Sequence, residues 1–120
     1  GIMDDLGLQG TTEYGNLMFT MGYFFHASGK PDKALEYYET AQKTWDKLRV
    51  QNTSRYIGLL YNTGKLYNDK GKPGKALEYY NKAKTICETL GMQNTSGYAD
   101  LIYTIAGLYH ETKNNKMFRS

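Results

Sequence analysis

The chain has 120 residues, 40% of them hydrophobic, so it can bury a core as one domain and is too apolar for a disordered tail. Its net charge of +3 is spread without a basic block, and no apolar run approaches the roughly 20 residues of a bilayer span, which argues against nucleic-acid and membrane partners. The single cysteine excludes an internal disulfide framework and, with no recognisable signal peptide, favours a cytoplasmic location.

The sequence repeats itself at an offset of 42 residues. The segment KPDKALEYY at 30–38 returns as KPGKALEYY at 72–80. Columns of related residues recur at the same period: Gln9, Gln51 and Gln93; Tyr14, Tyr56 and Tyr98; Leu17, Leu59 and Leu101. A period of this size is typical of stacked-repeat architectures, in which each unit buries its apolar face against the next.

Each repeat contains two helical patterns, called here the A helix and the B helix. Apolar residues recur at steps of three and four, and no stretch alternates with period two, so we expect helices and no sheet. The predicted A helices lie at about 12–27, 54–69 and 96–112, and the predicted B helices at about 31–48 and 73–90.

Glycine, proline and polar linkers set the predicted boundaries. Gly71 suits a left-handed helix end, and Pro73 suits the first turn of the helix that follows. The linker at 51–54 offers side chains that can cap the next A helix. Asn52 and Asn94 stand in glycosylation sequons, but both recur at the start of a helix, so capping is the better explanation.

The repeat frame divides residues 1–120 into one array. Its parts are the tail of a preceding B helix at 1–8, repeat 1 at 9–50, repeat 2 at 51–92, and a partial repeat 3 at 93–120. Phe118 stands where Ala34 and Ala76 stand in the earlier repeats, so the pattern has already broken there. We interpret the chain as a segment of a longer array.

The unit resembles a tetratricopeptide repeat. Signature positions of that family hold Met18, Gly22, Phe25, Gly29, Ala34, Tyr38 and Ala41 in repeat 1, and Leu60, Gly64, Tyr67, Gly71, Ala76, Tyr80 and Ala83 in repeat 2. The usual period is about 34 residues. The longer period here is similar to that of kinesin light chain-type repeats, which commonly carry His-Pro where this chain has Asn94-Thr95. The resemblance implies an all-α, right-handed superhelical solenoid of antiparallel helix hairpins, with about two and a half repeats.

Gly22 and Gly64 occupy the same slot inside the first two predicted A helices. A glycine there costs about 1 kcal/mol relative to alanine, so Gly22 and Gly64 need a structural reason. We expect Gly64 to face Ala76 and Ala83 of the following B helix, small residue against small residue. On this interpretation Gly64→Ala is mild or even stabilising.

No catalytic motif is present. The chain has no GxxxxGK, GxSxG, HExxH or CxxC sequence. His26 and His110 occupy the same slot two repeats apart, roughly 20 Å from each other, too far to share a metal or a proton. Cys87 occupies the slot of Trp45, which indicates a buried residue and no nucleophile. We therefore expect no enzyme activity, no metal and no cofactor.

A solenoid of this kind presents a concave groove built mostly from its A helices. The predicted groove residues are Phe19, Tyr23 and His26 in repeat 1, Tyr61, Asn62, Lys65 and Asn68 in repeat 2, and Tyr103 and His110 in repeat 3. Phe19, Tyr61 and Tyr103 would form an aromatic ladder, and Asn62 could bond the backbone of an extended peptide. The alternative is that these aromatic residues serve packing. Since Lys65 is the one well-placed cation, capture of a C-terminal carboxylate and RNA binding are both disfavoured.

These observations predict a non-catalytic scaffold that binds a protein or peptide segment in the groove. The alternative is a regulatory or sensor segment of a larger signalling enzyme or transcription regulator, in which the groove binds a signal peptide. The last A helix shows Leu101, Ile105, Leu108 and Tyr109 without a complete B helix to cover them. Self-association through this open C-terminal end is therefore a further expectation.

Overall fold

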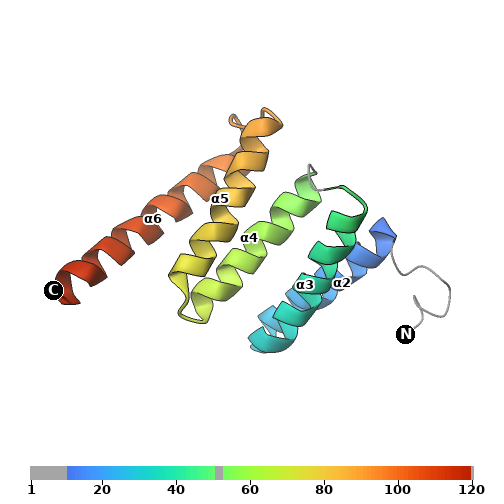
Figure 1. Cartoon of the computed structure of the whole chain (residues 1–120), viewed down its shortest axis with the longest axis horizontal. Helices are drawn as coiled ribbons and strands as arrows, with labels where there is room; N and C mark the ends of the chain where they lie inside the picture. The colour runs from blue at the N-terminus through green and yellow to red at the C-terminus, as the bar shows by residue number, and fades with distance from the viewer. Residues whose placement is uncertain (1–10, 51–52, 120) are drawn as a thin grey trace.

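The computed structural model describes residues 11–50 and 53–119, with side chains up to residue 113. Within these ranges every regular element is an α-helix: α2 (Thr12–Ala27), α3 (Pro31–Lys47), α4 (Ser54–Asp69), α5 (Pro73–Thr89) and α6 (Ser96–Arg119). Helices α2 and α3 form one antiparallel hairpin, α4 and α5 form the next, and α6 follows beside α5 (Figure 1). The predicted all-α stack of hairpins is confirmed. The predicted tail of a B helix at 1–8 lies outside the described residues.

The helices α2, α4 and α6 are the predicted A helices, and α3 and α5 are the predicted B helices. Four of the five begin and end within one residue of the predicted bounds. None of the helices in the described part of the chain combines the length and the hydrophobicity that a membrane crossing requires.

Threonine caps begin all three A helices. The side-chain oxygens of Thr11, Thr53 and Thr95 each accept a hydrogen bond, at 3.2 Å, from the backbone N–H three residues further on. These bonds satisfy N–H groups that have no partner within the helix. The threonines of both sequon-like segments thus act as helix caps, as the sequence indicates; Asn52 lies outside the described residues.

A left-handed residue follows each of α2, α3, α4 and α5. Gly29 and Gly71 both have φ of +77°, and the next N–H, that of Lys72 in the second hairpin, bonds back to the carbonyl of Tyr67 at 2.9 Å. At the end of α3 the left-handed position holds Arg49, with φ of +58°, where the next repeat has Gly91. A side chain strains this conformation by about 1–2 kcal/mol, so Arg49 is an unfavourable residue at this position.

The end of α6 differs from the prediction. An A helix ending near 112 was expected, but α6 continues to Arg119 and projects beyond the other helices (Figure 1). The cause is local, because Lys113 and Asn115 stand where Gly71 and Pro73 turn the chain in repeat 2. Without a left-handed glycine and a helix-starting proline, nothing stops the helix. The side chain of Phe118 lies outside the described residues.

Tyrosines of the B helices cover Gly22 and Gly64. A Cβ atom added at Gly64 would lie 2.7 Å from Cε1 of Tyr80, and one added at Gly22 would lie 2.5 Å from Cδ1 of Tyr38. The close approach of the helices is as predicted, but the predicted partner of Gly64 is wrong: its three nearest atoms belong to Tyr80, not to the alanines. The expectation that Gly64→Ala is mild therefore fails, because the added methyl has no room.

Candidate functional site on the A-helix face

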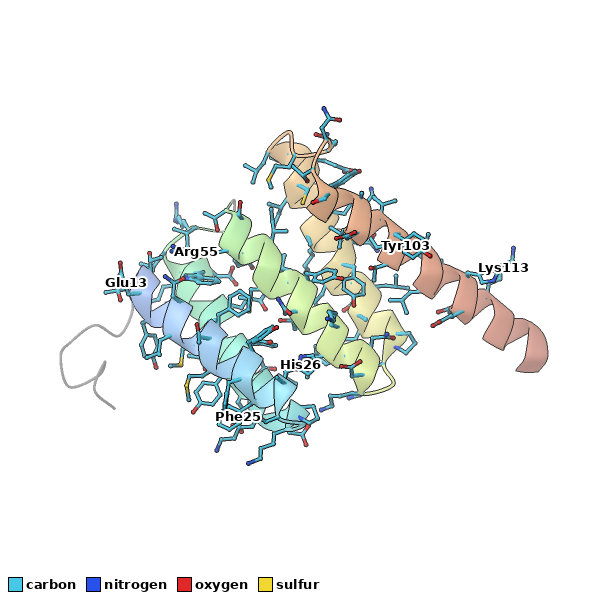
Figure 2. All side chains as sticks on the ribbon, turned by 180° about the vertical axis from the view of Figure 1, so that it is seen from behind. Glu13, Phe25, His26, Arg55, Tyr103 and Lys113 are labelled. Carbon is cyan, nitrogen blue, oxygen red and sulfur yellow. The ribbon has the colours of Figure 1, made fainter. Side chains whose placement is uncertain are left out.

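The A-helix face is the surface formed by α2, α4 and α6, and Figure 2 looks onto it. Four aromatic side chains of the described residues are more than half exposed: Tyr23, Phe24, Tyr103 and Tyr109. All four belong to α2 or α6. The tyrosines of α3 and α5 are instead buried or half-buried. Exposed aromatic surface is therefore concentrated on the A helices.

In repeat 1 the predicted groove residues differ in burial. Phe19 is half-buried, with its ring edge-on to Trp45 at a centroid distance of 6.1 Å, whereas Tyr23 is exposed. His26 bonds Asp69 of α4, with 2.8 Å between Nε2 and Oδ2, and thereby links the two repeats. Of the three, Tyr23 offers the most surface to a ligand.

In repeat 2 the predicted residues combine packing and exposure. The half-buried ring of Tyr61 lies 5.5 Å from the ring of Tyr80, and the ammonium of Lys65 lies 6.0 Å from the centre of the Tyr61 ring. The Asn62 amide donates to the carbonyl of Gly58 in its own helix at 2.8 Å, so one of its hydrogens is already engaged. Lys65 and Asn68 are exposed.

In repeat 3 both predicted residues are exposed. Tyr103 has 83% of its surface accessible, and His110 is exposed further along α6. Phe19, Tyr61 and Tyr103 occupy equivalent positions on the three A helices but are unequally available. The first two rings pack onto their own hairpins, and the third stands in solvent (Figure 2).

The sequence reasoning missed a pocket of about 240 Å³ between α4 and α6, here called the α4–α6 pocket. It is lined by Ser54, Ile57, Gly58, Tyr61, Cys87, Met92, Thr95, Gly97, Tyr98, Asp100 and Leu101. Cys87 and Leu101 are buried at its base, and burial raises the pKa of the Cys87 thiol, so the thiol stays protonated and apolar. The signal that could have found it is the change from Trp45 to Cys87 in one repeat slot.

A second depression, the B-helix groove, is lined by residues of α3, α4 and α5. Its two lobes, about 650 and 360 Å³, are lined by Glu39, Gln42, Lys43, Asp46, Tyr56, Leu60, Glu78, Tyr79, Asn81, Lys82, Thr85 and Ile86. The Tyr56 hydroxyl donates to Oδ1 of Asp46 at 2.7 Å. The lining mixes acids, lysines and amides, so it shows no preference for one ligand charge.

The described residues contain no cluster of metal-binding side chains. Within residues 11–50 and 53–113, whose side chains the structure describes, no three His, Cys, Asp or Glu side chains gather closely enough to hold a metal ion.

Stacked antiparallel hairpins with an aromatic A-helix face define a helical-repeat solenoid. A family model for the tetratricopeptide repeat matches residues 13–89, and the chain belongs to this family. Such repeats generally form non-catalytic scaffolds that mediate protein–protein interaction.

The crystal structure of BtubC (BKLC) from P. vanneervenii is similar in fold, with a TM-score of 0.77 and 19% identity. The match covers 82% of this chain and 39% of that chain, so this chain spans well under half of BtubC. No curated protein matches the sequence.

Proposed function

We propose that the chain is a non-catalytic scaffold that binds a peptide segment of a partner protein across the A-helix face. The observation that carries the proposal is the exposure of two tyrosines at predicted groove positions, Tyr23 on α2 and Tyr103 on α6, with Tyr103 the most exposed. An exposed tyrosine contributes little to the core, yet its rigid ring brings a large contact area to a bound peptide at low entropic cost.

A lysine at the centre of this face gives the middle of a bound peptide a preferred charge. Lys65 is exposed on the central A helix, beside the ring of Tyr61. Asp69, on the same helix, is already paired with His26. An acidic residue near the middle of a bound peptide would therefore meet Lys65, and complementary charge of this kind favours one ligand over its competitors.

The test starts from peptides selected against the protein from a displayed library. Affinity for the best peptide is then measured by calorimetry for Tyr103→Ala and Lys65→Glu, with a melting curve for each. We expect both variants to fold and to lose roughly fivefold or more in affinity, the size of an important interface residue. These two positions are chosen because Tyr61→Ala would also remove a ring that packs on Tyr80.

Lys43→Glu is the matched control, since it reverses an exposed lysine in the B-helix groove. It should leave binding unchanged. If Lys43→Glu weakens binding while Tyr103→Ala and Lys65→Glu do not, the ligand lies on the B helices and the proposal is wrong.

We also propose self-association through the open side of α6. Tyr109 is 54% exposed, whereas Tyr67 at the same slot of α4 is 8% exposed under α5. Ala106 is likewise exposed where Gly64 is buried. A second molecule that covered these residues would take the place that α5 has against α4.

A further inference from the structure

In the first hairpin, the repeat position equivalent to Cys87 holds the large side chain of Trp45. The indole of Trp45 is only 1% exposed, and its Nε1 donates to the carbonyl of Thr12 at 3.2 Å. Its ring packs edge-on against Phe19. Gly15 makes the room, because a Cβ atom at that position would overlap the indole.

One period later the same slots surround a pocket. At the equivalent repeat positions, Cys87 replaces Trp45, Ile57 replaces Gly15, Ser54 replaces Thr12, and Tyr61 replaces Phe19. All four of these residues line the α4–α6 pocket. The isoleucine fills part of the space that the indole would take, but its side chain is much smaller than an indole. The second hairpin therefore keeps open part of the space that the first hairpin fills with its own indole.

The size of this space sets the size of its ligand. The pocket measures about 240 Å³. An apolar cavity of about 150 Å³ accommodates benzene, while sites for drug-sized ligands begin at about 300 Å³. A ligand of one or two fused rings fits between these limits. Leu101 and the protonated thiol of Cys87 form the base, and Tyr61 and Tyr98 add aromatic walls.

The mouth of the pocket adds one charge. Asp100 is exposed there and is the one aspartate, glutamate, lysine or arginine in the lining. Its carboxylate makes no ion pair with any side chain that the structure describes. At the same end of the molecule, Lys84 is engaged by Glu88 at 3.0 Å and so does not neutralise Asp100. A cationic group at the mouth would therefore find an open partner.

From the internal comparison, the size and the charge together, we propose that the α4–α6 pocket binds a small planar aromatic molecule with a cationic group on a short chain, an arylalkylamine. The ring lies between α4 and α6, over Cys87 and Leu101, and the ammonium pairs with Asp100. A tryptophan side chain at position 87 would overlap Ile57. A free ligand is not attached to the backbone of residue 87, so its ring can enter from solvent and avoid that overlap. The pocket shares Tyr61 with the predicted groove, but it would recognise a small cationic aromatic molecule and not a peptide segment.

Tryptamine and indole-3-propionate are the probes, because they share the indole and differ in the charge of the chain. Each is titrated into the protein and followed by amide chemical shifts and by melting temperature. We expect saturable shifts at Gly58, Cys87 and Gly97 and a higher melting temperature, since a ligand that binds only the folded state stabilises it. Tryptamine should bind about 3- to 10-fold tighter than indole-3-propionate, because Asp100 attracts the ammonium of the first and repels the carboxylate of the second.

Three variants separate the parts of the inference. Asp100→Asn should reduce the difference between the two probes to about twofold or less, the loss expected for an exposed charge pair. The double variant Cys87→Trp/Ile57→Gly rebuilds the first hairpin's packing and should abolish tryptamine binding while remaining folded. Cys87→Ala keeps the pocket open and should retain binding. If the double variant does not fold, Cys87→Met fills the space with an unbranched side chain and serves in its place.

The inference is overturned if tryptamine gives no saturable shifts up to its solubility limit, or if its binding survives filling of the pocket. Equal affinity for indole-3-propionate would overturn the role of Asp100. Peptide binding that persists in the filled variant while tryptamine binding is lost leaves the proposed function intact and keeps the two tests distinct.

Discussion

Replacing Gly64 by alanine places a methyl group against the ring of Tyr80. The added carbon would lie 2.7, 2.9 and 3.1 Å from three ring atoms, all closer than ordinary contact. Tyr80 is buried and also packs on Tyr61, so its ring has little freedom to move away. Overpacking of this kind costs about 1–3 kcal/mol. The gain in helix propensity returns about 1 kcal/mol. The net expectation is a loss of stability of up to about 2 kcal/mol.

Gly58→Ala is the matched control on the same helix. Its added carbon would lie 3.7 Å from Cε2 of Phe19, an ordinary contact, so the propensity gain should appear undiminished. The difference between the two variants therefore isolates the overlap with Tyr80, since the propensity term cancels. Gly22→Ala should cost more than Gly64→Ala, because its carbon would also lie 3.2 Å from the backbone oxygen of Ala34, which cannot rotate away.

Urea denaturation followed by circular dichroism measures all three free energies of unfolding. The predicted order of stability is Gly58→Ala, parent, Gly64→Ala, Gly22→Ala. In a Tyr80→Leu background, Gly64→Ala should no longer cost stability, which a double-mutant cycle would show as a coupling energy. If Gly64→Ala is as stable as Gly58→Ala, Tyr80 does not cover Gly64 and the packing described above is wrong.

Further predictions concern three other positions. Arg49→Gly should stabilise the fold by about 1 kcal/mol in urea denaturation, because it removes a left-handed non-glycine residue. The hydroxyl of Tyr98 donates to Glu88 at 2.6 Å and lowers the pKa of that carboxyl below its usual 4.5. This stabilisation is present above pH 4.5 and lost as the pH falls through the lowered pKa, so Tyr98→Phe should melt below the parent at neutral pH and equal to it in acid. Light scattering should show concentration-dependent self-association that Tyr109→Lys abolishes; a strict monomer at high concentration would exclude the proposed α6 contact.

Much of the fold was predictable because local signals repeat with the period. Gly71 and Pro73 mark a turn that the structure shows, and the capping role of Thr53 follows from its place before a helix. The length of α6 was predictable in the same terms, since Lys113 and Asn115 break those signals. The partner of Gly64 was not, because helical spacing shows which faces meet but not which long side chain reaches across.

The candidate site was less predictable than the fold. Tyr61 and Tyr103 share one slot, yet one packs on Tyr80 and the other stands in solvent. Burial depends on the neighbouring helix, and repeat position alone does not specify it. The α4–α6 pocket depends on two exchanges on different helices, at Cys87 and at Ile57, whose combined volume emerges only when the helices are packed.

Mapping a selected peptide onto the protein by amide chemical shifts tests the central claim most directly. If the A-helix face binds the peptide, the largest changes should follow α2, α4 and α6 and include Tyr23, Lys65 and Tyr103. Changes confined to α3 and α5, around Gln42 and Asn81 of the B-helix groove, would contradict the claim.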